Sequence, residues 1–204
     1  SRGLGDVYKR QILTYFLTSF LLGGNEEKTY TIDLNKSKLR WVAKKLTGSH
    51  WGNIRLKSGI VNIKNNLPIS GEFIVDMKTI EVMDTKGSIW GKKLQSHLHS
   101  KDFFDTENHP EAKLSIKKVT MRNGRFIIDA DLSIKSIMHP IEFVCEIFQS
   151  GDLASARGKM EIDRTLYDVT YRSARYFPNI GDRMIHDIFT CLLYTSPSPR
   201  DTLL

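Results

Sequence analysis

The sequence contains six histidines, the side chains best suited to metal binding or to proton transfer near neutral pH. They are His50, His97, His99, His109, His139 and His186. The chain has neither an H-E-x-x-H motif nor the Cys/His spacing typical of zinc sites. The spacing therefore favours surface or turn histidines, and we assign no metal ligand. A metal-binding or stress-related module that uses surface histidines stays open as an alternative.

Catalysis would need a nucleophile or a paired acid and base. No G-x-S-x-G nucleophile motif occurs. Asp102, Asp105 and Glu107 are typical of capping and turn residues. Asp163 beside Arg164 indicates a structural ion pair. We predict no catalytic residue and no enzyme activity, and an enzyme of unknown chemistry stays a second alternative.

Histidines and acidic residues are most concentrated between Leu94 and Pro110, in the stretch LQSHLHSKDFFDTENHP. It combines three of the six histidines with a Phe-Phe pair that has an aspartate on each side. The pattern predicts the end of a short helix, roughly residues 86–99, and then a tight turn in which Asp102 caps backbone N–H groups. Phe103 and Phe104 must be buried, because two adjacent exposed phenylalanines would leave a large apolar area in water.

The rest of the chain alternates between apolar and polar residues with the two-residue period of β-strands. Asn123-Gly124 predicts a hairpin turn, and Met138-His139-Pro140 predicts another turn. Residues 79–91 lose the alternation, which predicts a loop leading into the helix. The pattern predicts about eight strands, with segments at residues 29–33, 37–46, 55–64, 72–77, 112–116, 125–135, 141–147 and 155–165, and closing segments at 167–171 and 184–192.

Antiparallel strands with one apolar face each must close into a barrel or stack as a sandwich to bury that face. We predict a mainly all-β fold, an antiparallel barrel of about eight strands with one short helical insertion between strands four and five. Such a barrel is wide enough to hold a small or elongated ligand, or it is filled by its own side chains. The inward rows are almost wholly uncharged. They contain Trp41, Phe73, Val75, Leu114, Ile116, Phe126, Ile128, Leu132, Ile134, Phe143 and Ile147.

The composition is that of a soluble globular protein, with 40% hydrophobic and 26% charged residues. The formal net charge is +7, but the basic residues are scattered, without an Arg-rich arm or an aromatic platform. We therefore predict no nucleic-acid partner. The two cysteines, Cys145 and Cys191, form neither a disulfide framework nor a CxxC metal site. Cys145 is predicted to be buried on a strand.

Both ends of the chain depart from the patterning of the interior. We interpret residues 1–11 and 191–204 as non-native or assembly-derived tails and exclude them from the fold. Residues 12–27 contain the apolar run ILTYFLTSFLL, which matches the core of a signal peptide followed by a linker. The run is shorter than the ~20 residues that span a bilayer, so we predict no stable membrane span. An ordinary helix or strand is the alternative for this run.

Six blocks occur in order over roughly residues 28–190. They are YTID, SKLRWVAKK, GSHWG, LQSHLHSKDFFDTENHPEAKLSI, DADLSIKSIMHPIEF and IDRTLYDVTY. Together they resemble the YceI-like family, known also as polyisoprenoid-binding proteins, and S-x-D-F-F-D followed by proline and a strand is the most specific part. The chain departs from the commoner family pattern where IKSIMHP replaces a Gly-Val-Thr-Lys-Pro-type turn. The segment IDRTLYDVTYRSARYF is similar to the Bacteroidetes-type branch.

The resemblance implies a lipocalin-like barrel over residues 28–190 with a hydrophobic tunnel, in a periplasmic or secreted protein. It implies carriage or storage of a long amphipathic lipid, such as an isoprenoid quinone, a polyprenyl phosphate or a fatty amide, and no other cofactor. Phe103 and Phe104 are expected to line the tunnel with the inward rows. His50 and His97 lie where strands end, and they are candidates to hydrogen-bond the lipid headgroup. A homodimer stays open.

Overall fold

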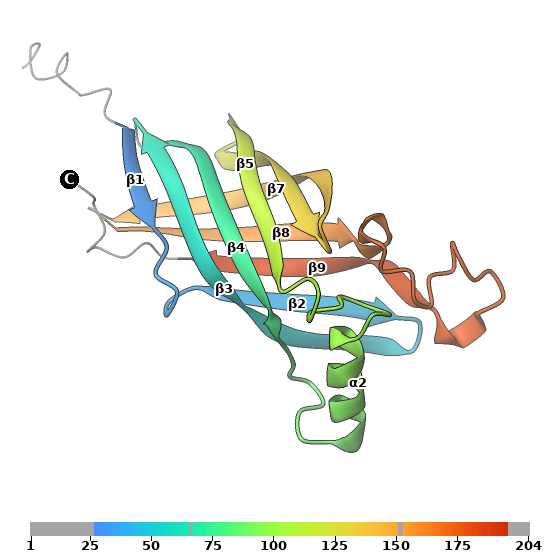
Figure 1. Cartoon of the computed structure of the whole chain (residues 1–204). Coiled ribbons are helices and arrows are strands. Elements are labelled where there is room, and N and C mark those ends of the chain that lie inside the picture. Colours follow the sequence, from blue (N-terminus) through green and yellow to red (C-terminus); the bar gives the residue numbers. More distant parts are fainter. Residues whose placement is uncertain (1–26, 66, 151–152, 196–204) are drawn as a thin grey trace, which may run out of the picture.

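The computed structural model describes residues 27–65, 67–150 and 153–195. They form one antiparallel sheet that closes into an eight-stranded barrel, with a single α-helix between β4 and β5 (Figure 1). The predicted fold class is therefore confirmed. The predicted signal-peptide core lies outside the described residues. Within the described part of the chain, no helix is long and apolar enough to cross a membrane.

Strands β2 to β9 follow the chain around the barrel, and β1 adds to β3 beyond the end of β2. The sheet order is β1-β3-β2-β9-β8-β7-β6-β5-β4, and β4 pairs with β3 to close the ring. β1 and β2 pair with successive parts of β3, so together they occupy one position in the barrel. The elements are β1 (Glu27–Thr31), β2 (Lys38–Lys45), β3 (Gly48–Lys64), β4 (Leu67–Val82), α2 (Ile89–His99), β5 (Glu111–Arg122), β6 (Arg125–Ile134), β7 (Ile137–Ser150), β8 (Leu153–Asp163), the 3₁₀ helices η1 (Arg164–Tyr167) and η2 (Gly181–Arg183), and β9 (Ile185–Thr195).

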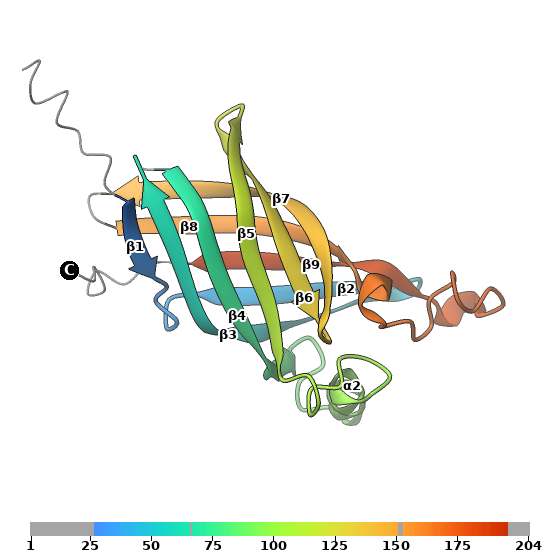
Figure 2. The ribbon, with the colours of Figure 1, turned by 45° about the horizontal axis from the view of Figure 1, so that its top comes forward.

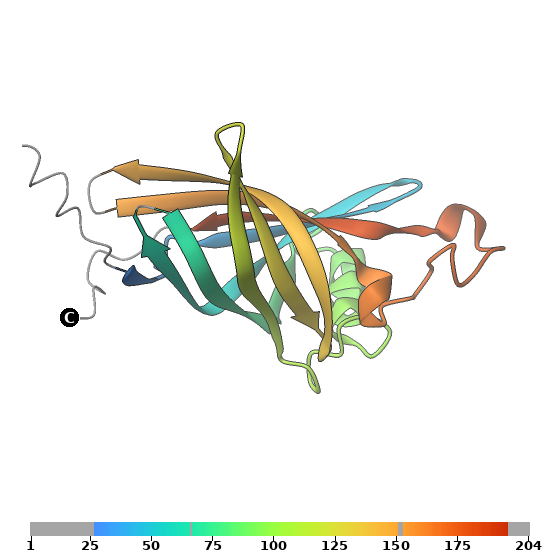
Figure 3. The same ribbon diagram turned by 90° about the horizontal axis from the view of Figure 1, so that it is seen from above.

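The strands cross the barrel at a steep tilt, as closure requires. Figure 2 shows β3 to β6 running across the direction of β2, β8 and β9. Figure 3 shows α2, η1 and the start of β9 at one end of the barrel, and the β7–β8 hairpin and β1 at the other. We call the end that carries α2 and η1 the helical end.

Alternation of side chains on β6 agrees with the sequence pattern. Ile128, Ala130, Leu132 and Ile134 point inward and are at most 7% exposed. The predicted hairpin at Asn123-Gly124 is confirmed, because both residues have positive φ angles, 51° and 74°. That is the geometry of a tight hairpin turn whose twist matches the flanking strands.

The loop predicted at residues 79–91 is wrong in its first part, because β4 continues to Val82. A bulge breaks the alternation there, where pairing with β3 skips from Asp76 to Glu81. Thr79 stabilises the bulge: its hydroxyl donates to the Asp76 carbonyl at 2.6 Å and accepts from the Arg55 N–H at 2.9 Å. The local pattern thus resembles a loop although the strand goes on.

The turn predicted at Met138-His139-Pro140 is also wrong, because these residues belong to β7. The actual turn consists of Lys135 and Ser136, with φ angles of 51° and 63°. Neither residue type favours this left-handed geometry. A tertiary contact holds it: the Lys135 ammonium donates to the Asp168 carbonyl at 2.8 Å and to the Asp168 carboxylate at 3.0 Å.

The strand predicted at residues 167–171 is replaced by η1 and a loop. Asp163 ends β8 by capping η1, since its carboxylate accepts from the Thr165 N–H at 2.9 Å and from the Thr165 hydroxyl at 2.6 Å. The last strand, β9, extends to Thr195 and so passes the predicted domain end at residue 190. Leu193 is buried on it. The helix α2 starts at Ile89 rather than near residue 86.

Gly52 is needed for the packing of β3 on β4. An added Cβ would lie 1.7 Å from the Glu81 carbonyl and 2.6 Å from the Trp41 ring. We therefore expect Gly52→Ala to lower the free energy of unfolding by about 1–3 kcal/mol, as overpacking does, in urea denaturation. The control is Gly158→Ala, whose Cβ would lie an ordinary 3.5 Å from Phe143. Equal losses in the two variants would contradict the prediction.

Candidate functional site

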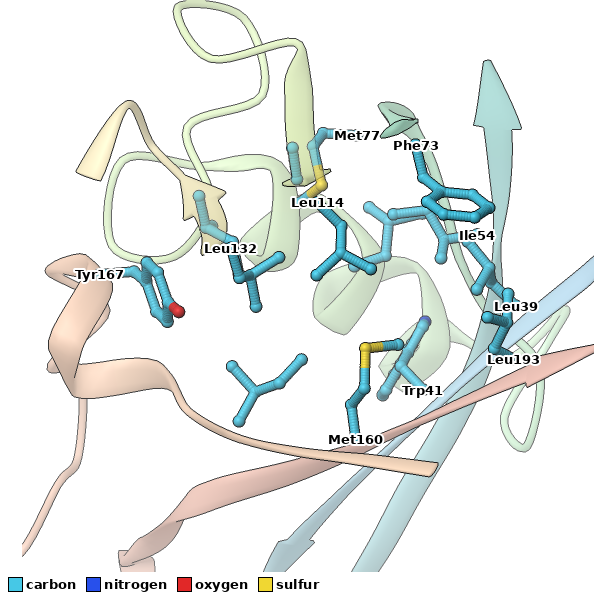
Figure 4. Close-up of a cluster of buried hydrophobic side chains, with 14 of the residues drawn as sticks. Leu39, Trp41, Ile54, Phe73, Met77, Leu114, Leu132, Met160, Tyr167 and Leu193 are labelled. Carbon is cyan, nitrogen blue, oxygen red and sulfur yellow. The ribbon is translucent and has the colours of Figure 1, made fainter. Parts of the chain in front are cut away.

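Two apolar cavities lie inside the barrel. Cavity 1 has a volume of about 130 Å³ and cavity 2 of about 80 Å³. Both are lined by Phe73, Leu114 and Leu193, so these three side chains form a partition between adjoining chambers. Figure 4 shows Leu114, Leu132 and Met160 converging on the same interior from β5, β6 and β8. The barrel is therefore not packed solid.

Most of the predicted tunnel residues line a cavity. Phe126 is the exception, because it packs against the core outside both cavities. Cavity 1 is lined by Trp41, Phe73, Val75, Phe103, Phe104, Leu114, Leu132 and Ile134. Cavity 2 is lined by Phe73, Leu114, Ile116, Ile128, Phe143 and Ile147. The inward rows read from the alternation thus surround the empty space.

Sequence reasoning missed part of the wall. Leu39 and Met160 also line cavity 1, and the same alternation that placed Trp41 could have included them. Met77 and Ile80 line it from the β4 bulge, and Leu98 lines it from α2. The two-residue period reaches Met77 from Phe73 and Val75 but holds for neither Ile80 nor Leu98, so strand patterning carried no signal for those two positions.

A hydrogen-bond network holds α2 against the end of β4. The Gln95 side chain accepts from the Val82 N–H at 2.7 Å and donates to the Ile80 carbonyl. Its amide nitrogen also lies 2.7 Å from His99 Nε2. Because this ring nitrogen accepts, His99 Nδ1 carries the proton and donates to the Thr106 hydroxyl at 2.8 Å. His99 therefore joins the helix to the following turn and is a structural residue.

The two phenylalanines of the turn join an aromatic cluster at the helical end. The Phe103 ring centroid lies 4.9 Å from that of His97 and 5.6 Å from that of Tyr171. Phe104 packs edge-on against Phe189 of β9 at 6.4 Å. The predicted burial is confirmed for Phe103, which is 6% exposed, and Phe104 is partly buried. Both line cavity 1 from outside the sheet.

Asp102 does not have its predicted capping role. Its carboxylate accepts from His97 Nε2 at 3.2 Å. Ser100 is the residue that ends α2, and its N–H donates to the His97 carbonyl. The chain then turns so tightly that Asp105 has a positive φ of 45°.

The two headgroup candidates, His50 and His97, make separate contacts. His50 lies on β3 near the β2–β3 turn, with Nδ1 2.7 Å from the Asp84 carboxylate. His97 packs on Phe103 and Tyr171. Neither histidine lines cavity 1 or cavity 2, and His97 instead borders an open surface pocket beside α2. Their role at a headgroup stays a prediction.

The histidines do not gather into a metal centre. Among the residues that the structure describes, no three His, Cys, Asp or Glu side chains lie close enough together to hold a metal ion. His109 Nδ1 lies 3.2 Å from the Ser136 hydroxyl. The His139 ring packs edge-on against Tyr167 at 5.4 Å. These contacts are those of turn and surface histidines.

Arg164 is a buried charge beside cavity 1, only 4% exposed. Its guanidinium donates to the carbonyls of Val169 at 2.6 Å, Ile185 at 3.0 Å and His186 at 3.1 Å. It also lies 3.4 Å from the Asp187 carboxylate. Burial lowers the pKa of Arg164, and the Asp187 charge opposes this shift. The guanidinium thus ties the loop after η1 to β9.

The ion pair predicted between Asp163 and Arg164 is therefore replaced by two others. Arg164 pairs with Asp187, and Asp163 pairs with Arg175 at 3.4 Å. Adjacent side chains on an extended segment point in opposite directions, so each finds its partner elsewhere. Adjacency in the sequence therefore did not predict the ion-pair partner of either residue.

Two polar groups in the cavity walls carry no charge. Burial raises the pKa of Cys145 to about 11 and that of Cys191 to about 12, so both thiols are protonated at neutral pH. The predicted burial of Cys145 is confirmed. Trp41 is 6% exposed, and its indole Nε1 has no hydrogen-bond partner among the described residues. Since a buried indole N–H usually finds an acceptor, this atom is an unsatisfied donor on a side chain that lines cavity 1.

A sequence profile of the YceI-like domain matches residues 30–188. The chain belongs to the YceI-like family. It is 33% identical over 55 residues to the UPF0312 protein plu2095 of Photorhabdus laumondii, and this match covers 27% of the chain and 29% of that relative. The match thus spans less than a third of the relative's length.

Solved structures share the fold at low sequence identity. BcnA of Burkholderia cenocepacia is 17% identical, with a TM-score of 0.68, and the match covers 82% of this chain and 99% of that one. A polyisoprenoid binding domain from Saccharophagus degradans, implicated in plant cell wall breakdown, is 13% identical, with a TM-score of 0.59 and coverages of 83% and 97%. A YceI protein of Campylobacter jejuni is 15% identical, with a TM-score of 0.51 and coverages of 65% and 74%.

Removal of the Arg164 side chain leaves the buried Val169 carbonyl, two partly buried carbonyls and the Asp187 carboxylate without their donor. We expect Arg164→Ala to lower the free energy of unfolding by about 3–5 kcal/mol, the cost of breaking a buried charge pair, in chemical denaturation. Arg175→Ala is the control, because this side chain is 56% exposed and its pair with Asp163 contributes about 1 kcal/mol or less. Comparable losses of unfolding free energy in the two variants would show that the Arg164 contacts contribute no more than an exposed ion pair.

Proposed function

We propose that the protein binds a long amphipathic lipid with its hydrocarbon chain inside the barrel, and that it carries or stores this lipid. The pair of adjoining apolar cavities is the observation that carries the proposal. Membership of the YceI-like family and the shared fold with a polyisoprenoid binding domain support it. An isoprenoid quinone, a polyprenyl phosphate or a fatty amide has the required chain. Export to the periplasm or beyond remains part of the proposal.

The cavity volumes constrain how such a chain would enter. A cavity of about 150 Å³ holds one benzene molecule, so cavity 1 at about 130 Å³ takes a similar fragment as it stands. A longer chain must pass the partition of Phe73, Leu114 and Leu193 to use cavity 2. Met77 and Met160 line cavity 1, and their unbranched side chains adapt to new shapes. We therefore propose that the wall rearranges when the lipid enters.

Apolar burial supplies enough free energy for this binding. Each buried CH₂ group contributes about 0.8 kcal/mol, so about ten buried carbons contribute about 8 kcal/mol before the costs of association. The charged side chains that line cavity 1 already have partners, because the Arg164 guanidinium is bonded to carbonyls and the Lys113 ammonium pairs with Glu111, while both cavity thiols are protonated. These features favour a binding protein over an enzyme.

We further propose that Trp41 recognises a polar group of the lipid. Trp41 lines cavity 1 and its buried N–H has no hydrogen-bond partner among the described residues, so a rearranged wall can present this donor to a ligand. An oxygen of a quinone ring, an amide or an ether would accept this hydrogen bond, whereas a pure hydrocarbon would not. Donors of this kind fix the orientation of a ligand in an apolar pocket.

The proposal is tested by extraction of the purified protein with organic solvent, followed by mass spectrometry. We expect a quinone, a prenyl lipid or a fatty amide in the extract. We also expect the delipidated protein to bind a fluorescent fatty acid, and Ala43→Phe, which fills cavity 1, to reduce this binding at least tenfold. Val144→Phe on the outer face is the matched control. A protein that is empty and binds no hydrophobic probe would overturn the proposal.

Replacement of Trp41 tests its proposed donor role separately. Trp41→Phe keeps an aromatic ring but removes the N–H. We expect it to weaken binding of an isoprenoid quinone about tenfold, since one hydrogen bond contributes about 0.5–1.5 kcal/mol and more when desolvated, in a fluorescence titration. Binding of a saturated hydrocarbon probe should not change selectively. Equal losses of affinity for the quinone and for the hydrocarbon probe would show that Trp41 contributes packing and no hydrogen bond.

A further inference from the structure

The face of α2 that points away from the barrel is apolar at its start, although it is in contact with water. Ile89 is 73% exposed and Trp90 is 75% exposed. The opposite face is held on β4: Gly91 and Leu98 are buried, and Gln95 bonds to the strand. The helix cannot simply rotate to hide the two side chains, since a Cβ at Gly91 would already lie 2.1 Å from the Thr85 carbonyl.

The same face is strongly basic. Residues 86–101 contain four lysines and no acidic residue. Lys86 pairs with Glu81 at 2.6 Å, but Lys92 and Lys93 have no acidic partner within the described part of the chain. The Lys93 ammonium instead lies 4.9 Å from the centre of the Trp90 ring. We call Ile89, Trp90, Lys92 and Lys93 the α2 patch.

We propose that the α2 patch docks the protein on the surface of a membrane that contains anionic phospholipids. Tryptophan is favoured at the boundary between headgroups and acyl chains, because its ring is amphipathic. Lysines beside it attract an anionic surface, and this combination on one helix face is typical of interfacial binding. Two protruding apolar side chains offer far less than the ~1,000 Å² that a stable protein interface needs, so a lipid surface fits better than a protein partner.

The position of the α2 patch also fits docking on a membrane surface. The other end of α2 supplies Leu98 to the wall of cavity 1, and the turn after it supplies Phe103 and Phe104. Figures 1 and 3 show α2 outside the strands at the helical end. Docking through the α2 patch would therefore bring the helical end of the barrel, with its adaptable wall, close to the lipid phase. This inference goes beyond lipid binding, and its test requires no occupied cavity.

Sedimentation of the whole protein with vesicles tests the docking surface. We expect binding to phosphatidylcholine vesicles that contain phosphatidylglycerol, and much weaker binding to phosphatidylcholine alone. Trp90→Ala should lower the partition coefficient several-fold. Lys92→Gln with Lys93→Gln should lower it about 30-fold, because each lysine contributes about 1 kcal/mol at such a surface. High salt should weaken the binding of the unaltered chain in the same way.

Two control variants match these changes elsewhere on the barrel. Phe148→Ala removes a half-exposed aromatic side chain near the C-terminal end of β7. Lys117→Gln with Lys118→Gln removes a neighbouring lysine pair on β5. Circular dichroism should show that all variants are folded. The proposal is overturned if the controls lose as much binding as the patch variants, if phosphatidylglycerol has no effect, or if Trp90→Ala abolishes a dimer instead of vesicle binding.

Discussion

The pairing of β2 with β9 is the constraint on which the rest of the structure depends. It joins the first long strand to the last and places Leu39 opposite Leu193 and Trp41 opposite Cys191. Without this closure both strands would be free edges, and the inward rows would face water. Closing so long a segment of chain costs conformational entropy, which the apolar interior must offset. The barrel and its cavities therefore form together.

The helical end shows how polar groups are kept beside an apolar interior. Gln95 and Arg164 direct their donors to backbone carbonyls, so the Arg164 charge in the wall of cavity 1 is paired. The aromatic cluster around Phe103 and Tyr171 connects the turn after α2 with the loop after η1. Lipid entry at this end would disturb packed rings more than hydrogen bonds. That difference matters because dispersion contacts re-form in new arrangements more easily than buried polar networks.

Local signals predicted the fold where each strand obeys its own two-residue period. β6 and the Asn123-Gly124 turn are such cases. The same reasoning failed at three places where a side-chain contact decides the backbone. Lys135 adopts a left-handed turn because Asp168 holds its ammonium, β4 continues through a bulge that bonds to Arg55, and Asp163 ends β8 by capping η1. For the candidate site, inward rows could be predicted, but Ile80 and Leu98 could not, since bulges and helices do not share the strand period.

By itself, the sequence determined the class of fold, the apolar rows and the need to bury Phe103 and Phe104, because alternation and hydrophobicity act over a few residues. Only the tertiary structure decided which members of these rows surround empty space. Phe73 separates two cavities, whereas Phe126 on a neighbouring row packs outside both. The ion pair between Arg164 and Asp187 is likewise a result of the tertiary structure. The same is true of the Trp41 N–H, which has no acceptor among the described residues. These outcomes depend on how strands far apart in the chain meet, and pairing register is a property of the closed barrel as a whole.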